Sequence, residues 1–444
     1  MRLTNFAGRI LYLVQRNKRR IPTIIKQNEI IPTIAYYSNT LQLGGSEVYL
    51  KDILKNVDFK KYKILFIGPH KHPLREWINT QPQIQSINLD GVLNIVSAHP
   101  LENKQLDASN EKSSSPNSVK NLWHRHVPAS LKLFIGTLKD IRRLKKFFKK
   151  LSVDLIHFND TGCEPPVIAA RLAGIPKIIG TFHVEPAYER QKTDWAHRLI
   201  EYFSTRCLHL GVSVSAAVRE AWVKRTGVSR DKIFVVYNGI DLEKFKSLKT
   251  NKPAGLKEFN CSENDKIICV PARLHPMKGH HDLLAAVQQY FQNKTDIKFL
   301  LVGDGPLRQE IENFLKKNRL QDSVKILGFR KDIADIMRLS DLIVLPSISL
   351  EALPYVLIEA MACSKPVVAT NFSGIPEVVE DNVTGLLVPR KNPQALADAI
   401  NRLLENPQKA AGMGEAGRKR VETLFAQERM LDETFTLYES LLNG

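Results

Sequence analysis

The sequence predicts an α/β fold with two parallel β-sheets, each packed against helices. Short β-branched and aliphatic runs alternate with amphipathic helical patterns along most of the 444 residues. Strands that alternate with helices form parallel sheets through right-handed crossovers. The candidate strands fall into two sets of six, separated by a polar stretch. Two Rossmann-like domains account for this pattern, and the chain is long enough for both.

The individual elements follow from local patterns. Strands are expected where short apolar runs are bounded by polar or glycine-containing segments. The first set lies at 33–37, 63–67, 155–158, 177–181, 210–214 and 233–236. The second set lies at 266–271, 298–302, 324–327, 342–346, 366–369 and 385–388. Helices are expected where apolar residues recur every three or four positions, at 46–55, 281–292, 307–318, 393–405 and 427–442.

Changes of composition divide the chain into a basic segment at 1–30, a first domain at 31–240, a second domain at 241–426 and a C-terminal helix at 427–444. The helix is expected to pack back on the first domain. The polar stretch 241–265 is the expected linker, and the Ser- and Asn-rich stretch 102–121 is expected to be a surface loop.

The formal net charge of +18 is concentrated in two places. Residues 1–30 and residues 139–150 each hold seven Lys and Arg against one acidic residue. A local excess indicates one anionic surface as partner and not a nucleic-acid groove along the chain. Because no zinc-finger, RNP or helix-turn-helix signature occurs, no nucleic acid is expected as partner, although a basic nucleic-acid-binding protein stays the alternative from another class.

The basic segment 1–30 also carries apolar side chains, among them Phe6, Ile10 and Leu13. This mixture favours a helix on an anionic membrane surface, and a disordered basic tail is the alternative. No run approaches the ~18 apolar residues that span a bilayer, so an integral membrane protein is not expected. The five cysteines form no C-x-x-C pair, which indicates reduced thiols in a cytoplasmic protein.

Two carboxylates stand out in the segment 346–379. Glu351 is expected on the loop after strand 342–346, and Glu359 inside a helix that begins near Pro354. Both would lie at the carboxyl edge of a parallel sheet, where open α/β folds bind ligands. If only these two residues are considered, the alternative interpretation is that both are ordinary glutamates on the protein surface.

The block E-A-L-P-Y-V-L-I-E-A-M-A-C at 351–363, followed by K-P-V-V-A-T and G-I-P-E, resembles a family signature. It is similar to that of the retaining nucleotide-sugar glycosyltransferases of family 4, which have the GT-B fold: two Rossmann-like domains facing across a cleft. Further blocks occur in the expected order, at 43–47, 235–241, 271–279, 302–312 and 327–333. The resemblance covers about residues 33–425 and departs from the family where glycines are common, at Ala352 and Ser373.

The resemblance implies a donor site in the second domain. Arg273 and Lys278 would neutralise the leaving diphosphate; an Arg fork and a Lys charge can do this without a metal. No Asp-x-Asp pair and no zinc-ligand spacing occur in the sequence, so no metal or other cofactor is expected. Glu359 would accept hydrogen bonds from the ribose hydroxyls, and Glu351 would hold the transferred sugar and offset charge at its anomeric carbon.

Further donor contacts are implied at Ala352 and Leu353 and on two loops. Phe329 and Arg330 match the place where the family's backbone reads the base. Gly303 and Gly305 would let their loop approach the nucleotide closely. A dinucleotide-binding fingerprint is excluded there, because Arg308 occupies the third glycine position.

The first domain carries two implied site elements. Gly44 and Gly45 precede a helix, and free backbone N–H groups at that point favour an anion cradle, with an ordinary tight turn as the alternative. His183 matches the family's active-site histidine, which is expected to bond the transferred sugar or the acceptor.

The resemblance implies a metal-independent enzyme that transfers a hexose-type sugar from a nucleotide sugar, with retention, to a hydroxyl of a sugar or lipid-linked acceptor. Cell-surface polysaccharide, lipopolysaccharide or glycolipid synthesis is the expected context. The expected location is cytoplasmic, with a peripheral position at the inner membrane face as a further expectation. A GT-B phosphorylase or a sugar-nucleotide epimerase is the enzymatic alternative.

Overall fold

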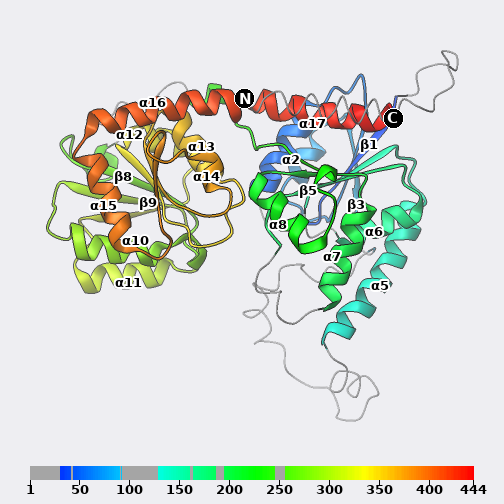
Figure 1. Cartoon of the computed structure of the whole chain (residues 1–444), viewed down its shortest axis with the longest axis horizontal. Helices are drawn as coiled ribbons and strands as arrows, with labels where there is room; N and C mark the ends of the chain where they lie inside the picture. Colours follow the sequence, from blue (N-terminus) through cyan, green and yellow to red (C-terminus); the bar gives the residue numbers. More distant parts are fainter. Residues whose placement is uncertain are drawn as a thin grey trace, which may run out of the picture. The chain divides into compact units, whose positions relative to one another are not determined.

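A computed structural model describes residues 31–41, 44–90, 92, 129–160, 164–186, 195–245 and 256–444. The chain divides into two compact units (Figure 1). The first holds the described residues up to Ser213, together with Arg219–Phe234 and Thr434–Gly444. The second holds Val214–Val218 and Val235–Glu433. The predictions for 1–30 and 102–121 lie outside the described residues.

The first unit contains a seven-stranded parallel sheet of order β3-β2-β1-β4-β5-β6-β7. Its strands are β1 (Thr33–Tyr37), β2 (Lys63–Gly68), β3 (Ile84–Asn88), β4 (Leu155–Phe158), β5 (Lys177–Phe182), β6 (Leu210–Ser213) and β7 (Ile233–Val235). All six predicted strands are present. The strand β3 was not predicted, because this edge strand buries only Ile84 and therefore lacks a continuous apolar run.

The helices of the first unit are α2 (Gly45–Asn56), α3 (Arg75–Asn79), α5 (Ala129–Phe148), α6 (Glu164–Ala173), α7 (Trp195–Cys207), most of α8 (Ala216–Thr226) and the short η4 (Arg230–Lys232). Figure 1 shows α5, α6 and α7 side by side, in agreement with their contacts. The basic segment 139–150 lies mostly in the last turns of α5, before β4.

The second unit contains a six-stranded parallel sheet of order β10-β9-β8-β11-β12-β13. Its strands are β8 (Lys266–Pro271), β9 (Ile297–Val302), β10 (Val324–Gly328), β11 (Leu342–Leu345), β12 (Val367–Thr370) and β13 (Gly385–Val388). All six predicted strands of the second set are confirmed. The strand order reverses between β8 and β11, which is where open α/β sheets bind ligands.

The helical segments of the second unit are η5 (Leu242–Phe245), η6 (Pro276–Lys278), α10 (His280–Ala286), the π-helical η7 (Val287–Phe291), α11 (Arg308–Asn318), α12 (Ile333–Leu339), α13 (Tyr355–Ala362), α14 (Ile375–Val378), α15 (Pro393–Leu404) and α16 (Pro407–Leu424). The single helix predicted at 281–292 is therefore divided, with a π-helical turn at its end.

Hydrophobic clusters cover both faces of the second sheet. Ile267 and Cys269 point into one cluster, and Ile268 and Val270 point into the other, because successive side chains of a strand face opposite ways. Residues 256–261 contribute Leu256, Phe259 and Cys261 to the first cluster. The linker prediction for 241–265 was therefore wrong for its second half, where three buried apolar residues are hidden among polar ones.

The C-terminal helix α17 (Gln427–Leu442) has the predicted bounds, and the first unit includes its residues from Thr434 onward. The Tyr438 hydroxyl lies 2.6 Å from His157 Nδ1, and His157 Nε2 lies 2.6 Å from Thr181 Oγ1. Burial lowers the pKa of His157 to about 3, so the ring is neutral. These buried hydrogen bonds fix the end of α17 on strands β4 and β5.

Glu377 of the G-I-P-E block caps the first turn of α8. Its two carboxylate oxygens accept the backbone N–H groups of Ala216 and Ala217, each at 2.7 Å. A carboxylate at a helix N-terminus interacts favourably with the helix dipole and with the unpaired N–H groups. The contact explains why Val214–Val218 belong to the second unit.

Candidate functional site

The residues at the carboxyl ends of β8 and β11 form a site in the second unit. Arg273 and Lys278 follow β8, while Ser347 and Glu351 follow β11. Lys278 Nζ donates to Glu351 Oε1 at 2.5 Å, and Ser347 Oγ donates to the same oxygen at 2.6 Å. Arg273 is exposed on the loop that carries Lys278. The strand order therefore brings together two predicted residues that are 73 positions apart in the sequence.

The ion pair between Lys278 and Glu351 was not predicted. Glu351 is only 6% exposed, and its second oxygen, Oε2, accepts no hydrogen bond within the described part of the chain. Ser347, which is fully buried, was also missed. The serine stands four residues before the glutamate, and this spacing indicates a hydrogen bond between them only when the conformation of the loop is known.

Gly303 and Gly305 are positioned by their own backbone surroundings. Both have positive φ angles, 147° and 159°. A Cβ atom would come within 2.2 Å of the Ala272 carbonyl at Gly303, and within 2.5 Å of the Leu274 carbonyl at Gly305. Close contact between the loops after β8 and β9 therefore requires glycine here. Their predicted approach to a nucleotide stays a prediction.

Glu359 lies in α13, which begins at Tyr355, directly after Pro354 as predicted. Its side chain is largely buried and accepts no hydrogen bond from any described residue. Burial raises the pKa of Glu359 to about 7, an effect that the charge of Lys244 reduces. A buried carboxylate without donors is suited to receive donors from a ligand.

Phe329 and Arg330 follow β10. Phe329 is 75% exposed. The Arg330 guanidinium is bound on both sides, by Asp332 at 2.6 Å and by Glu258 at 2.7 Å, and these bonds raise its pKa. The side chain of Arg330 is therefore occupied by carboxylates, which is consistent with recognition of a base through the backbone of this loop.

Ala352 and Leu353 lie between the two glutamates. Leu353 is buried, and its carbonyl accepts from Asn238 Nδ2 at 3.3 Å. A Cβ atom at Gly374 would come within 1.6 Å of the Ala352 carbonyl. Ser373 adopts a left-handed φ of 49°, a conformation that glycine reaches at lower cost than serine.

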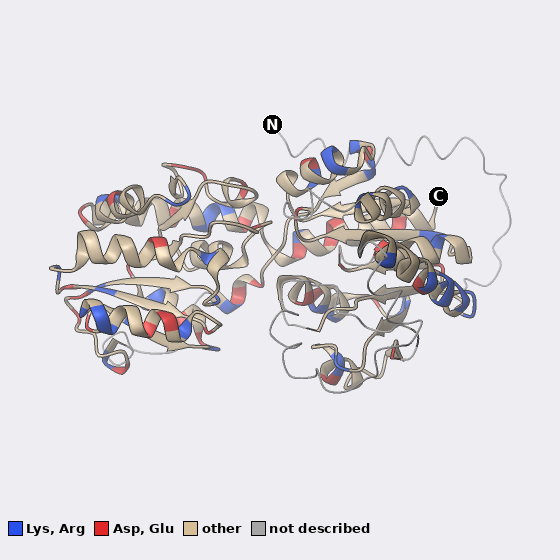
Figure 2. Cartoon of the chain, turned by 90° about the horizontal axis from the view of Figure 1, so that it is seen from below, with Lys and Arg blue, Asp and Glu red and all other residues tan. Residues whose placement is uncertain are grey.

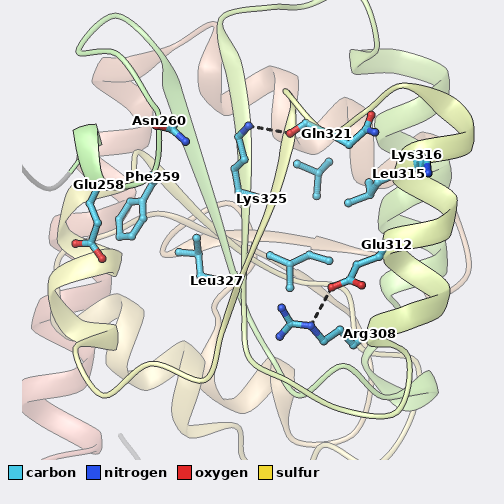
Figure 3. Close-up of a pocket in the computed structure, with 12 residues that line it drawn as sticks. Glu258, Phe259, Asn260, Arg308, Glu312, Leu315, Lys316, Gln321, Lys325 and Leu327 are labelled. Carbon is cyan, nitrogen blue, oxygen red and sulfur yellow. Dashed lines mark hydrogen bonds and ion pairs between the residues drawn. The ribbon is translucent and has the colours of Figure 1, made fainter.

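A hollow of about 490 Å³ lies elsewhere in the second unit, over the edge strand β10 (Figure 3). Two of its basic side chains have partners within the protein: Arg308 binds Glu312 at 2.9 Å, and Lys325 donates to the Gln321 carbonyl at 2.8 Å. None of the predicted site residues is among those that line it. The hollow is therefore separate from the predicted chemistry.

In the first unit, the Gly44–Gly45 turn follows β1 and begins α2. The N–H of Gly44 donates to Glu47 Oε2 at 3.0 Å, and Ser46 Oγ lies 2.9 Å from both Glu47 oxygens. Burial raises the pKa of Glu47 to about 7. The predicted anion cradle thus already contains the carboxylate of Glu47, which the G-x-x-E spacing of a capping box could have revealed.

His183 lies after β5 in the same unit. Its ring makes an edge contact with Tyr49 at 5.1 Å, and its Nε2 atom is inaccessible and has no hydrogen-bond partner among the described residues. Burial lowers the pKa of His183 to about 3, although a hydrogen bond with the backbone of Asn159 opposes this shift. The imidazole is therefore neutral and is suited to hydrogen bonding rather than to charge compensation.

Asn159, which follows β4, connects these groups. Its Nδ2 donates to the Ser46 carbonyl at 3.0 Å. The strand order of the first sheet reverses between β1 and β4, so the predicted residues of this unit also gather at a ligand-binding edge. Among the described residues of the whole chain, no group of three or more His, Cys, Asp or Glu is arranged to hold a metal ion.

Comparisons with known proteins agree with this architecture. The model described as Glycosyltransferase Family 4 matches residues 108–244, and the model described as Glycosyl transferases group 1 matches residues 252–420. The chain belongs to the family 4 glycosyltransferases and has their GT-B fold. It is therefore a glycosyltransferase.

Two relatives and one structure illustrate the similarity. The chain is 28% identical over 279 residues to the Escherichia coli UDP-Gal:alpha-D-GlcNAc-diphosphoundecaprenol alpha-1,3-galactosyltransferase, covering 61% of this chain and 72% of that enzyme. It is 29% identical over 338 residues to an uncharacterized glycosyltransferase of Methanocaldococcus jannaschii, covering 74% of this chain and 88% of the relative. The crystal structure of Anabaena HepE with UDP matches with a TM-score of 0.70 at 21% identity, covering 92% of this chain and all of that one, which supports the fold.

Proposed function

We propose that the protein transfers a hexose-type sugar from a nucleotide sugar to an acceptor hydroxyl, with retention of anomeric configuration and without a metal ion. The observation that carries this proposal is the group of side chains at the β8–β11 edge. A cation, Lys278, is held against the buried Glu351, and the carboxylate of Glu359 has no hydrogen-bond donor within the described ranges of the chain. The group combines charges for a diphosphate with acceptors for hydroxyls.

Each residue then has a role in the proposal. Arg273 and Lys278 stabilise the charge that develops on the leaving diphosphate. Glu359 accepts from the ribose hydroxyls, and Glu351 accepts from the transferred sugar. The backbone at Phe329 and Arg330 contacts the base. The neutral His183 contributes a hydrogen bond to the sugar or the acceptor.

The proposed acceptor is a sugar or lipid-linked sugar in the synthesis of a cell-surface polysaccharide or glycolipid. The name of the Escherichia coli relative specifies a diphosphoundecaprenol-linked acceptor and a UDP-galactose donor. HepE was crystallised with UDP and with UDP-glucose. These names support a nucleoside diphosphate sugar as donor.

A thermal-shift screen over UDP, GDP, ADP and CDP and their common sugar derivatives tests the proposal. We expect one nucleotide series to raise the melting temperature, and its sugar derivative to be hydrolysed slowly without an acceptor. Turnover should persist in EDTA, because Arg273 and Lys278 supply the positive charge. Absence of any stabilising nucleotide would contradict the proposed function. Loss of turnover in EDTA that Mg²⁺ or Mn²⁺ restores would contradict metal independence alone.

We further propose that the first unit associates with an anionic membrane surface. The described part of the chain contains no helix long and apolar enough to cross a membrane. Along α7, Trp195, Tyr202 and Phe203 are 49%, 42% and 50% exposed, and the Arg206 guanidinium lies 3.5 Å from the Tyr202 ring centre. Large aromatic side chains next to arginine suit the headgroup region of a bilayer.

The neighbouring helix α5 adds positive charge to this surface. Lys139, Arg142, Arg143 and Lys146 are exposed near its end, where Lys and Arg are frequent (Figure 2). The ring of Phe134 on α5 lies 5.5 Å from that of Trp195 on α7. Each basic residue near an anionic surface contributes ~1 kcal/mol of attraction, so several together can retain the protein there.

Liposome flotation tests the membrane proposal. We expect the protein to float with vesicles that contain phosphatidylglycerol but not with neutral vesicles, and to be released as salt rises, because exposed charges are screened. Deleting residues 1–30, or the triple change of Trp195, Tyr202 and Phe203 to Ala, should reduce flotation. Val383→Ala removes an exposed apolar side chain of the second unit and is the control. Equal flotation with anionic and neutral vesicles would contradict the proposal while leaving the transferase proposal intact.

A further inference from the structure

Two donors share one oxygen of Glu351. The Lys278 ammonium and the Ser347 hydroxyl both bond Oε1, at 2.5 Å and 2.6 Å. The two donors differ in environment, since the Lys278 side chain is partly accessible whereas Ser347 is fully buried. Lys278 can therefore change partner when a ligand arrives, and Ser347 cannot turn to solvent.

Ser347 is itself held by the neighbouring strand. The Thr370 hydroxyl, at the end of β12, donates to the Ser347 carbonyl at 2.5 Å. The backbone of the glutamate is fixed separately, because the N–H of Gly374 donates to the Glu351 carbonyl at 3.1 Å. The preceding residue, Leu350, adopts a left-handed φ of 57°, a conformation that a leucine keeps only where its surroundings impose it.

We propose that Ser347 is a positioning residue for Glu351. Its hydroxyl fixes Oε1, so that Oε2 stays presented to the ligand after Lys278 has moved from Glu351 to the leaving phosphate. This inference rests on the proposed function, in which Lys278 binds the diphosphate. Without Ser347, the departure of Lys278 would leave the carboxylate with no donor among the described side chains and free to rotate.

The proposal predicts where the effect of Ser347→Ala appears. A hydrogen bond to a charged group that acts mainly in the transition state is expected to change kcat by roughly ten- to a hundredfold. The dissociation constant of the bare nucleoside diphosphate should stay within twofold, because Glu351 does not bind the nucleotide. Ser347→Thr keeps the hydroxyl and should restore most of kcat.

Ser340→Ala is the matched control. Ser340 is buried in the same unit, and its hydroxyl donates one hydrogen bond, to the Ile336 carbonyl at 2.8 Å at the end of α12. The Ser340→Ala variant should lower the melting temperature about as much as Ser347→Ala does, and its kcat should stay within twofold of the wild-type value. The assay is hydrolysis or transfer of the nucleotide sugar that the thermal-shift screen identifies.

The outcomes separate this proposal from the proposed function. If the wild type turns over a nucleotide sugar and Ser347→Ala reduces kcat no more than Ser340→Ala, the positioning role is wrong and the transferase function stands. A loss of affinity for the bare nucleoside diphosphate also overturns it. If no nucleotide in the screen binds the wild type, the proposed function itself fails.

Discussion

Lys278→Ala is expected to slow sugar transfer by about 10²-fold or more. A charge-assisted contact to a leaving phosphate contributes ~1.5–3 kcal/mol, and more in a site from which water is excluded. The variant also removes the cation that lies 2.5 Å from the buried Glu351. Both effects act on the same step, since the leaving group and the sugar are stabilised together. Initial rates at saturating donor measure the loss.

Lys325→Ala is the control for this substitution. The Lys325 side chain is 24% exposed, compared with 25% for Lys278, and it also has an acidic neighbour, Asp322, at 3.8 Å. It lies at the hollow over β10, apart from the proposed donor site (Figure 3). The rate of sugar transfer by the Lys325→Ala variant should stay within twofold of the wild-type rate. An equal loss in both variants would show that the effect comes from general surface charge.

A double variant distinguishes catalysis from stability. Lys278→Ala leaves a buried carboxylate without its cation, which is destabilising. Adding Glu351→Gln removes that charge and should recover much of the melting temperature, but turnover should stay low because both functional groups are absent. If the double variant recovers activity together with stability, Lys278 has only a structural role.

The sequence was sufficient to predict the two sheets and to nominate residues for a donor site, because both depend on local patterns. Buried parallel strands are short apolar runs, and twelve of them were recognisable. The edge strand β3 was missed because four of its five residues are not buried. The buried residues Leu256 and Phe259 were missed because they are isolated in a polar stretch.

The partners of the predicted residues could not be read from the sequence. Contacts such as Lys278 with Glu351, or Glu377 with the first turn of α8, join positions far apart in the chain. They depend on strand order, and on loop conformations such as the left-handed Leu350 that no motif specifies. The occupation of Arg330 by Asp332 and Glu258 likewise becomes visible only in three dimensions.

Glu359→Gln is expected to change both nucleotide affinity and the pH dependence of stability. Burial raises the pKa of Glu359 from 4.5 to about 7 in the ligand-free protein. A raised pKa in the folded state means that its contribution to stability is complete below pH 4.5 and is lost as pH rises through 7. The ionised form is disfavoured by roughly 3 kcal/mol, at 1.36 kcal/mol for each pH unit. The glutamine variant lacks this loss, so it should be more stable than the wild type at pH 8 and similar at pH 4.5.

Glu433→Gln is the control for the effect on stability. Burial also raises the pKa of Glu433 to about 7, but this residue lies in α17 and pairs with Arg429 at 2.7 Å. The Glu433→Gln variant should change the pH dependence of the melting temperature in the same direction as Glu359→Gln. The gain in stability should be smaller, because the substitution also removes the ion pair with Arg429. It should leave nucleotide affinity unchanged, because Glu433 has no proposed contact with the donor.

Nucleotide binding should show the opposite pH trend from stability. The ribose hydroxyls donate to the ionised carboxylate, so the affinity of the wild type for the nucleoside diphosphate should rise as pH increases through 7. Glutamine keeps one acceptor oxygen, so the loss of one hydrogen bond to a charged group should weaken binding of Glu359→Gln by about ten- to a hundredfold at pH 8, and by less at pH 5.5. Glu351→Ala should bind the same nucleotide almost as the wild type does, while its turnover falls. Calorimetry on the three proteins decides between the roles, since weak binding by the Glu351 variant with normal binding by the Glu359 variant would mean that the two carboxylates are exchanged.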